Sequence, residues 1–196
     1  MKITQLLATA CVAVALAGCA HPMNIKPDVE TLAAPANNIK IQKSVGFYIS
    51  AADRNSELTT AGGGGDKVSY HPYADMETGL YKMFGNVFSS VTVLSGPNDV
   101  ASIAKNSVVY VIEPKITTVS SSSGFFTWMA TDFTVNLTCN VSDTSGHSIA
   151  SVASIGTGHA VFDELKKNFS VAGERAALDA LLKQQAALLD NAALKQ

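Results

Sequence analysis

The sequence predicts an α+β fold, with a single mixed or mainly antiparallel sheet of about five strands and two helices packed on one face. Segments with alternating apolar side chains, typical of strands, outnumber segments with the 3–4-residue apolar spacing of helices. The helical segments do not alternate regularly with the strands, which argues against a doubly wound parallel sheet. Apolar residues make up 47% of the 196 residues and charged residues 15%, so the chain can bury a core.

The first expected element of this domain is a strand at residues 39–50, where Val45, Phe47 and Ile49 alternate with other residues. Residues 51–71 are then expected to form a long loop.

Four consecutive glycines at 62–65 lie in that loop, followed by Asp66 and Lys67. A phosphate-binding loop would follow an apolar strand and would place Ser or Thr after its lysine. Here Val68 follows Lys67 and no apolar strand leads in, so a flexible loop is the favoured interpretation.

Two segments show the apolar spacing of amphipathic helices. The first follows Pro72, a residue suited to the first turn of a helix, and extends to about Phe88. The second extends from about Val171 to Leu194 and carries Leu and Ala without a cluster of positive charge, so docking on the sheet is favoured over membrane insertion. The stripes are Met76, Leu80, Met83, Phe84 and Val87 in the first helix, and Leu178, Leu181, Leu182, Leu188 and Leu189 in the second.

Four more segments have the composition and alternation of strands. They are residues 91–94, 107–119, 125–142 and 148–162. Pro114 indicates a bulge or a sheet edge in the second of them. The last two are expected to pair as a hairpin.

The beginning of the chain has the pattern of a bacterial lipoprotein leader. A positive residue, Lys2, precedes an apolar run that is shorter than the ~20 residues of a transmembrane helix. The run ends in a lipobox, in which an aliphatic residue and two small residues precede the cysteine that receives diacylglycerol. These residues are Leu16, Ala17, Gly18 and Cys19. The sequence therefore predicts a signal peptide at 1–18 and lipidation of Cys19.

The residue after the cysteine is Ala20, not the Asp that commonly retains such proteins in the inner membrane. We therefore expect the outer membrane, with the domain in the periplasm. The formal charge of −2 includes the single charge of Lys2, so the mature chain is near −3. Lys and Arg form no cluster, which argues against nucleic acid as a partner and leaves the lipid as the membrane anchor.

Residues 19–38 are expected to form the lipidated cysteine and a flexible, Pro-containing tether, with the domain at 39–196. Pro22, Pro27 and Pro35 favour an extended chain there. Fully extended, the tether would reach about 60 Å.

Cys139 is the only thiol left after processing, because Cys11 leaves with the leader and Cys19 is alkylated. The mature monomer can form no intrachain disulfide. Cys139 lies on the apolar phase of its strand and is interpreted as a buried small hydrophobic residue.

No catalytic, metal or cofactor residues are predicted. His71, His147 and His159 lack the spacing of metal ligands, and the chain lacks a Gly-x-Ser-x-Gly elbow. The glycines at 156 and 158 indicate a bulge or close packing in a strand.

An aromatic cluster follows a run of serines. It contains Phe125, Phe126 and Trp128. Core packing and a surface that contacts a partner or a membrane both remain open for these side chains.

The layout of lipobox, Pro-containing segment, strand, helix, hairpin and C-terminal helix resembles the YajG-like group of small Gram-negative lipoproteins. The resembling stretches are residues 16–22, 76–94 and 133–182, the last including 158–162. The layout is also similar to the α+β module of curli-secretion and TolB-type envelope proteins. The resemblance implies a binding or assembly role and lends no catalytic residues.

We therefore expect a non-enzymatic outer-membrane lipoprotein that binds another envelope protein or associates with itself. One alternative is an auxiliary lipoprotein of an envelope transport system. Another is a hydrolase acting on envelope glycan or lipid, which would need a pocket with convergent polar groups.

Overall fold

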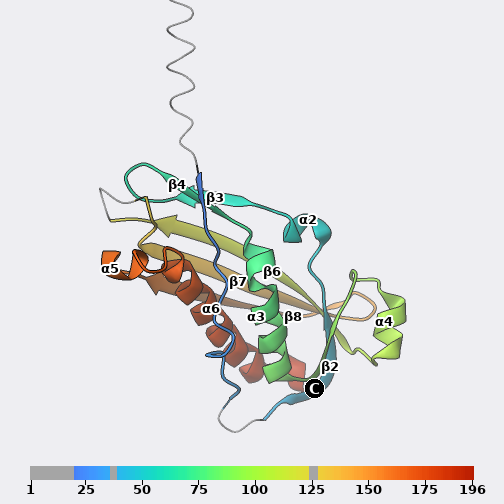
Figure 1. The fold of residues 1–196 in the computed structure, drawn as a ribbon. Helices are drawn as coiled ribbons and strands as arrows, with labels where there is room; N and C mark the ends of the chain where they lie inside the picture. Colours follow the sequence, from blue (N-terminus) through green and yellow to red (C-terminus); the bar gives the residue numbers. More distant parts are fainter. Residues whose placement is uncertain (1–19, 36–38, 124–127) are drawn as a thin grey trace, which may run out of the picture.

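The computed structural model describes residues 20–35, 39–123 and 128–196, and in this part of the chain two sheets and five α-helices are present (Figure 1). The α+β class is confirmed, whereas the expectation of a single sheet with two helices is wrong. In chain order the elements are β1 (Ala20–Pro22), β2 (Ile41–Phe47), α2 (Ala51–Arg54), β3 (Leu58–Ala61), β4 (Lys67–Tyr70), α3 (Pro72–Val87), β5 (Phe88–Val93), α4 (Val100–Lys105), β6 (Tyr110–Ser121), β7 (Asp132–Asp143), β8 (Ser148–His159), α5 (Phe162–Leu165), α6 (Val171–Asp190) and the 3₁₀ helix η1 (Ala192–Lys195).

The larger sheet contains the five strands that the alternation predicts, in the order β5-β2-β6-β7-β8. It is mixed, since β2 pairs in parallel with β5 and β6, and β7 pairs antiparallel with β6 and β8. Pro114 lies in β6 beyond Ile112, the last residue of β6 that pairs with β2. Its missing N–H therefore faces no strand, as expected for a residue at a local sheet edge.

The smaller sheet has the order β1-β4-β3. Its strands β3 and β4, together with α2, replace the long loop expected at 51–71. The prediction failed because β3 and β4 have four residues each, too few to establish a period of two. The four glycines form the turn between these antiparallel strands, where Gly64 and Gly65 have positive φ angles. A phosphate-binding loop would instead join a strand to a helix.

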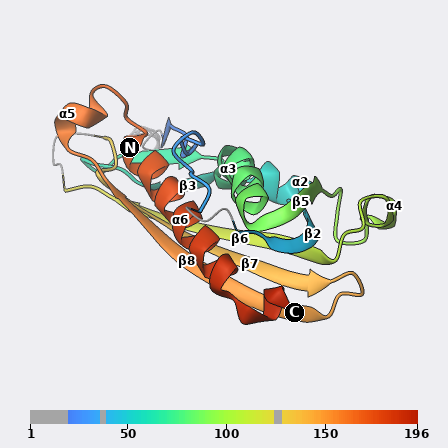
Figure 2. The ribbon, with the colours of Figure 1, turned by 90° about the horizontal axis from the view of Figure 1, so that it is seen from below.

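The two long helices, α3 and α6, lie on the same face of the larger sheet, as expected (Figure 2). The three short helices were not predicted because four to six residues are too few for a helical period. The face of β7 under the helices is apolar and buried, and it includes the Cys139 thiol. The opposite face of the same strand carries Thr and Asn.

Helix α6 packs unusually close to β8. A Cβ atom added to Gly156 would collide with the backbone of Ala176 and Ala180, and one added to Gly158 would collide with Ala172. The pairing of β7 with β8 is regular along these glycines. Of the two interpretations of the glycine pair, close packing is therefore confirmed.

Residues 20–35, which we call the N-terminal segment, do not stand clear of the domain as the expected tether would. Ile25 and Leu32 are fully or almost fully buried, and the segment lies along α3 and α6 (Figure 1). The N–H of Ile25 donates to the carboxylate of Asp75 on α3 at 3.0 Å. Ile25 also lies against Gly173 on α6, where a Cβ would be 2.6 Å from its side chain.

The far end of the N-terminal segment is held by amide side chains from both helices. Asn86 on α3 donates to the Leu32 carbonyl, and Gln185 on α6 donates to the Ala33 carbonyl. Asn86 also donates to the Gln185 side chain at 2.9 Å. Residues 28–33 form turns, so the segment is not extended throughout as the prolines led us to expect. Burial of Ile25 and Leu32 fixes it to the domain.

Replacing Gly156→Ala is expected to lower the free energy of unfolding by about 1–3 kcal/mol, because the new methyl group forces α6 away from β8. Urea denaturation measures the loss. Gly85→Ala in α3 is the control: it meets no atom within 4 Å and should be neutral or stabilising. Equal stability of the Gly156 variant and the parent would contradict the close packing.

Replacing Ile25→Ala should cost about 2–4 kcal/mol, since it empties a fully buried site. The exposed neighbour Lys26→Ala should change stability by less than about 0.5 kcal/mol. Thermal and urea unfolding of both variants tests this difference. A free tether would make both substitutions neutral.

Candidate functional site

The predicted lipobox residues and the aromatic residues Phe125 and Phe126 lie outside the described part of the chain. Trp128 is described, and it is half-buried against the main core. Its ring stacks on His21 with a centroid distance of 4.4 Å, and Phe169 lies 5.4 Å away. Trp128 therefore packs partly against the core, and its interpretation as a contact with a partner or a membrane stays a prediction.

One end of the molecule is defined by β1, which we call the anchor end. Ala20 is the first residue of β1 and pairs with Lys67 of β4. Consecutive Cα atoms are about 3.8 Å apart, so Cys19 is one residue away from a backbone fixed in a sheet. The same end contains the turn of four glycines, whose Gly63 N–H donates to the Trp128 carbonyl at 2.9 Å.

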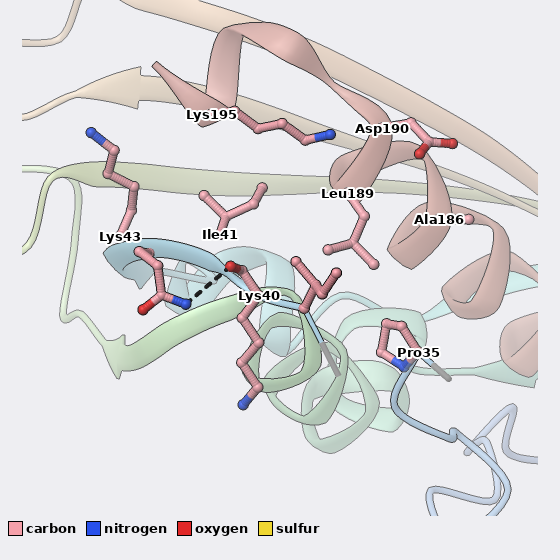
Figure 3. A pocket seen from close by; sticks show the side chains of 10 residues that line it. Pro35, Lys40, Ile41, Lys43, Ala186, Leu189, Asp190 and Lys195 are labelled. Atoms are coloured by element: carbon pink, nitrogen blue, oxygen red, sulfur yellow. Dashed lines mark hydrogen bonds between the residues drawn. The ribbon is translucent and has the colours of Figure 1, made fainter. Parts of the chain in front are cut away.

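The opposite end of the molecule is where β2 starts and α6 ends (Figure 1). A pocket of about 570 Å³ lies there (Figure 3). It is lined by Pro35, Ile39, Lys40, Ile41, Gln42, Lys43, Ala186, Leu189, Asp190 and Lys195. Five of these ten residues are aliphatic, and four are charged. The Lys40 ammonium donates a hydrogen bond to the Gly85 carbonyl, so one of its donors already has a partner within the protein.

Sequence reasoning missed this pocket because its residues come from three segments far apart in the chain. The one hint of the pocket in the sequence is Ile39, an apolar residue that precedes the alternating part of its strand. In the structure its side chain is 67% exposed. The N-terminal segment delivers Pro35 to the pocket, and η1 delivers Lys195. The residue pattern of any single helix or strand is therefore not enough to predict the pocket.

The remaining sequence candidates are separated in space and have local partners. His159 pairs with Asp132 at 2.7 Å, and His147 pairs with Asp143 within the β7–β8 hairpin. Hydrogen bonds from Thr131 and His159 hold the pKa of Asp132 below its usual range. In the described ranges no three His, Cys, Asp or Glu side chains are grouped closely enough to hold a metal ion.

Cys139 is buried as expected. Loss of contact with water raises the pKa of its thiol to about 12, although the Gln184 side chain opposes the shift. A thiol with such a pKa is not ionised near neutral pH and is not a nucleophile there.

One ion pair joins α5 to the start of α6. Arg175 forms two hydrogen bonds with Glu164, at 2.6 and 3.1 Å. Together with the Val161 N–H they lower the pKa of Glu164 to about 2. No helix of the described ranges is both long and apolar enough to span a membrane.

No family model and no curated protein sequence matches the chain. Solved structures that resemble it include a protein of the DUF330 family from Xanthomonas campestris, with 13% identity, a TM-score of 0.40, and coverage of 87% of this chain and 91% of the other. A minor lipoprotein from Acinetobacter baumannii has 10% identity and a TM-score of 0.37, over 74% of this chain and 91% of the other. A putative lipoprotein from Caulobacter crescentus has 14% identity and a TM-score of 0.30, over 42% and 65%. Similarities of this size assign neither a family nor an activity, and membership of the YajG-like group stays a prediction.

Proposed function

We propose that this chain is an outer-membrane lipoprotein with a non-enzymatic role, and that it binds another envelope protein through the pocket at its far end. The observation that carries the proposal is the position of β1. The predicted lipid attachment site is directly followed by a strand of the folded domain, and the pocket lies at the other end of that domain.

The length of α6 sets the distance between these two features. Its 20 residues span about 30 Å, because an α-helix rises 1.5 Å per residue. A domain anchored at Cys19 would hold the pocket about that far from the lipid surface. This distance suits a protein that meets partners in the periplasm while remaining fixed to the membrane.

The chemistry of the pocket favours an apolar side chain of a partner as its occupant. Ile39, Ile41 and Leu189 supply aliphatic surface, and Lys43 and Lys195 lie at its edge (Figure 3). An aliphatic or aromatic anchor with an acidic neighbour would match this arrangement. A transport-system component is one such partner, in which case the chain would act as its auxiliary lipoprotein.

Lipid anchoring is tested by Cys19→Ala. The variant is expected to remain an uncleaved precursor without incorporated fatty acid and to lose its outer-membrane fraction, because only that thiol can be alkylated at the lipobox. Cys11→Ala is the matched control and should be processed as the parent is. Radiolabelled palmitate and density-gradient fractionation provide the measurements. Undiminished outer-membrane localisation of the Cys19 variant would refute the proposed anchor.

The pocket is tested by Ile39→Asp, which places a carboxylate on its apolar wall. In-cell crosslinking should then lose the partner band by about tenfold, the usual cost of disturbing a central apolar contact. Val100→Asp on α4 changes an equally exposed aliphatic side chain outside the pocket, 72% against 67%, and should keep the band. If both variants retain the crosslink, or both lose it, the pocket is not the binding site.

A further inference from the structure

We propose that the anchor end contacts the lipid surface directly through an aromatic rim, formed by Trp128, Phe162 and Phe169. This inference rests on the proposed lipidation of Cys19. It adds an orientation to the anchoring, with the rim on the membrane and the pocket directed away from it.

Very little chain separates the predicted lipid from the folded domain. Ala20 is already paired with Lys67 in a parallel register that continues through Pro22 and Ser69. Met23 extends the attachment by donating its N–H to the Ser69 carbonyl at 2.9 Å. Because the acylated cysteine directly precedes this sheet, the domain has no spacer to lift it from the headgroups.

The aromatic rim lies around the start of the described chain. His21, two residues after the predicted lipid site, stacks on Trp128, and Trp128 in turn contacts Phe169. Phe169 lies in the connection from α5 to α6, and Phe162 is the first residue of α5, toward the end of the molecule that holds β1 (Figures 1 and 2). Trp128 therefore lies beside His21, near the start of the described chain, and Phe169 extends this aromatic surface.

The two phenylalanines of the rim are unusually exposed. Phe162 is 50% exposed and Phe169 43%, whereas every other described phenylalanine is buried. Single exposed apolar side chains are ordinary on protein surfaces, but Phe169 contacts the only tryptophan, and Phe162 lies in α5, the helix that leads to Phe169. Tryptophan is enriched at the headgroup level of membranes, and Trp and Phe form the apolar face of helices that lie in that interface.

Two of the positive charges around the rim are paired with carboxylates. Lys166 pairs with Asp163 at 2.7 Å, and Arg175 pairs with Glu164 at 2.6 Å. The exposed side chains of Lys67 and Lys167 form no ion pair with the described residues, which leaves a small positive charge at this end. Contact with lipid would depend on the acyl anchor and the aromatic rings and would change little with salt.

A lipid surface fits the rim better than a protein partner because of the anchor geometry. A protein bound there would have to enter between the domain and a bilayer that is one residue away. The bilayer itself is already at that position.

Trp128 is the only tryptophan and thus reports on the rim without labelling. The lipidated protein would be reconstituted in phosphatidylethanolamine and phosphatidylglycerol vesicles that contain lipids brominated on the acyl chains, which quench tryptophan at contact. We expect Trp128 emission to fall roughly twofold relative to vesicles without bromine, at low and at high salt. Flotation of the same vesicles reports separately on the anchor.

The control carries Trp128→Phe together with Ile39→Trp, which moves the only tryptophan to the pocket end. Its emission should be unaffected by bromine. Phe169→Ser should reduce the quenching of Trp128, while Val100→Ser on α4 should leave it unchanged.

Protein that floats with the vesicles but shows no quenching of Trp128, or equal quenching from the pocket end, would overturn the proposed contact and leave the anchor intact. Protein that fails to float would overturn the anchor and this inference with it.

Discussion

Burial of the N-terminal segment between α3 and α6 is the constraint that determines how the rest of this molecule is arranged. Ile25 and Leu32 occupy the seam between the helices, and Asp75 receives the Ile25 N–H. Burial raises the pKa of Asp75, and backbone hydrogen bonds from Ile25 and from His71 oppose that shift, so the N-terminal segment supplies one of the partners of this carboxylate. The same packing places β1 beside β4 and completes the smaller sheet.

The seam itself depends on small residues beneath it. Ala172, Ala176 and Ala180 let α6 pack directly on the glycines of β8. This close approach determines how near to the sheet α6 lies where it contacts α3. Gly79 on α3 makes the second close contact, since a Cβ there would meet Leu181 of α6 and Pro27 of the N-terminal segment. Gly156 and Gly158 of β8 and Gly79 of α3 thus allow the sheet, both helices and the N-terminal segment to pack as one core.

The long elements could be predicted from the sequence because each repeats its pattern often enough to be recognised. The strands β6, β7 and β8 have 12 residues each, and the stripes of α3 and α6 extend over several turns. The elements that were missed are short or lack a period. β1 has three residues and ends in proline, and Ile25 and Leu32 are isolated apolar residues among polar ones. Their burial follows from a groove that exists only after α3 and α6 have packed.

The candidate sites, like the short elements, could be predicted from the sequence only in part. Trp128 could be chosen from the sequence because a large aromatic residue beside a run of serines is unusual, but its contacts with His21 and Phe169 come from distant segments. The pocket had no sequence signal as a whole. What links the two ends is the N-terminal segment, which begins at the anchor end and reaches the pocket at Pro35. The two ends of the molecule are therefore connected by one segment, which is fixed to the domain at Ile25, Pro27 and Leu32.

Amide hydrogen exchange of the mature protein tests the burial of this segment most directly. The N–H groups of Met23 and Ile25 donate to Ser69 and Asp75, and they should exchange as slowly as those of the neighbouring strand β4. Exchange of both amides at the rate of an unstructured peptide would show that the segment is a free tether and would contradict its burial between the two helices.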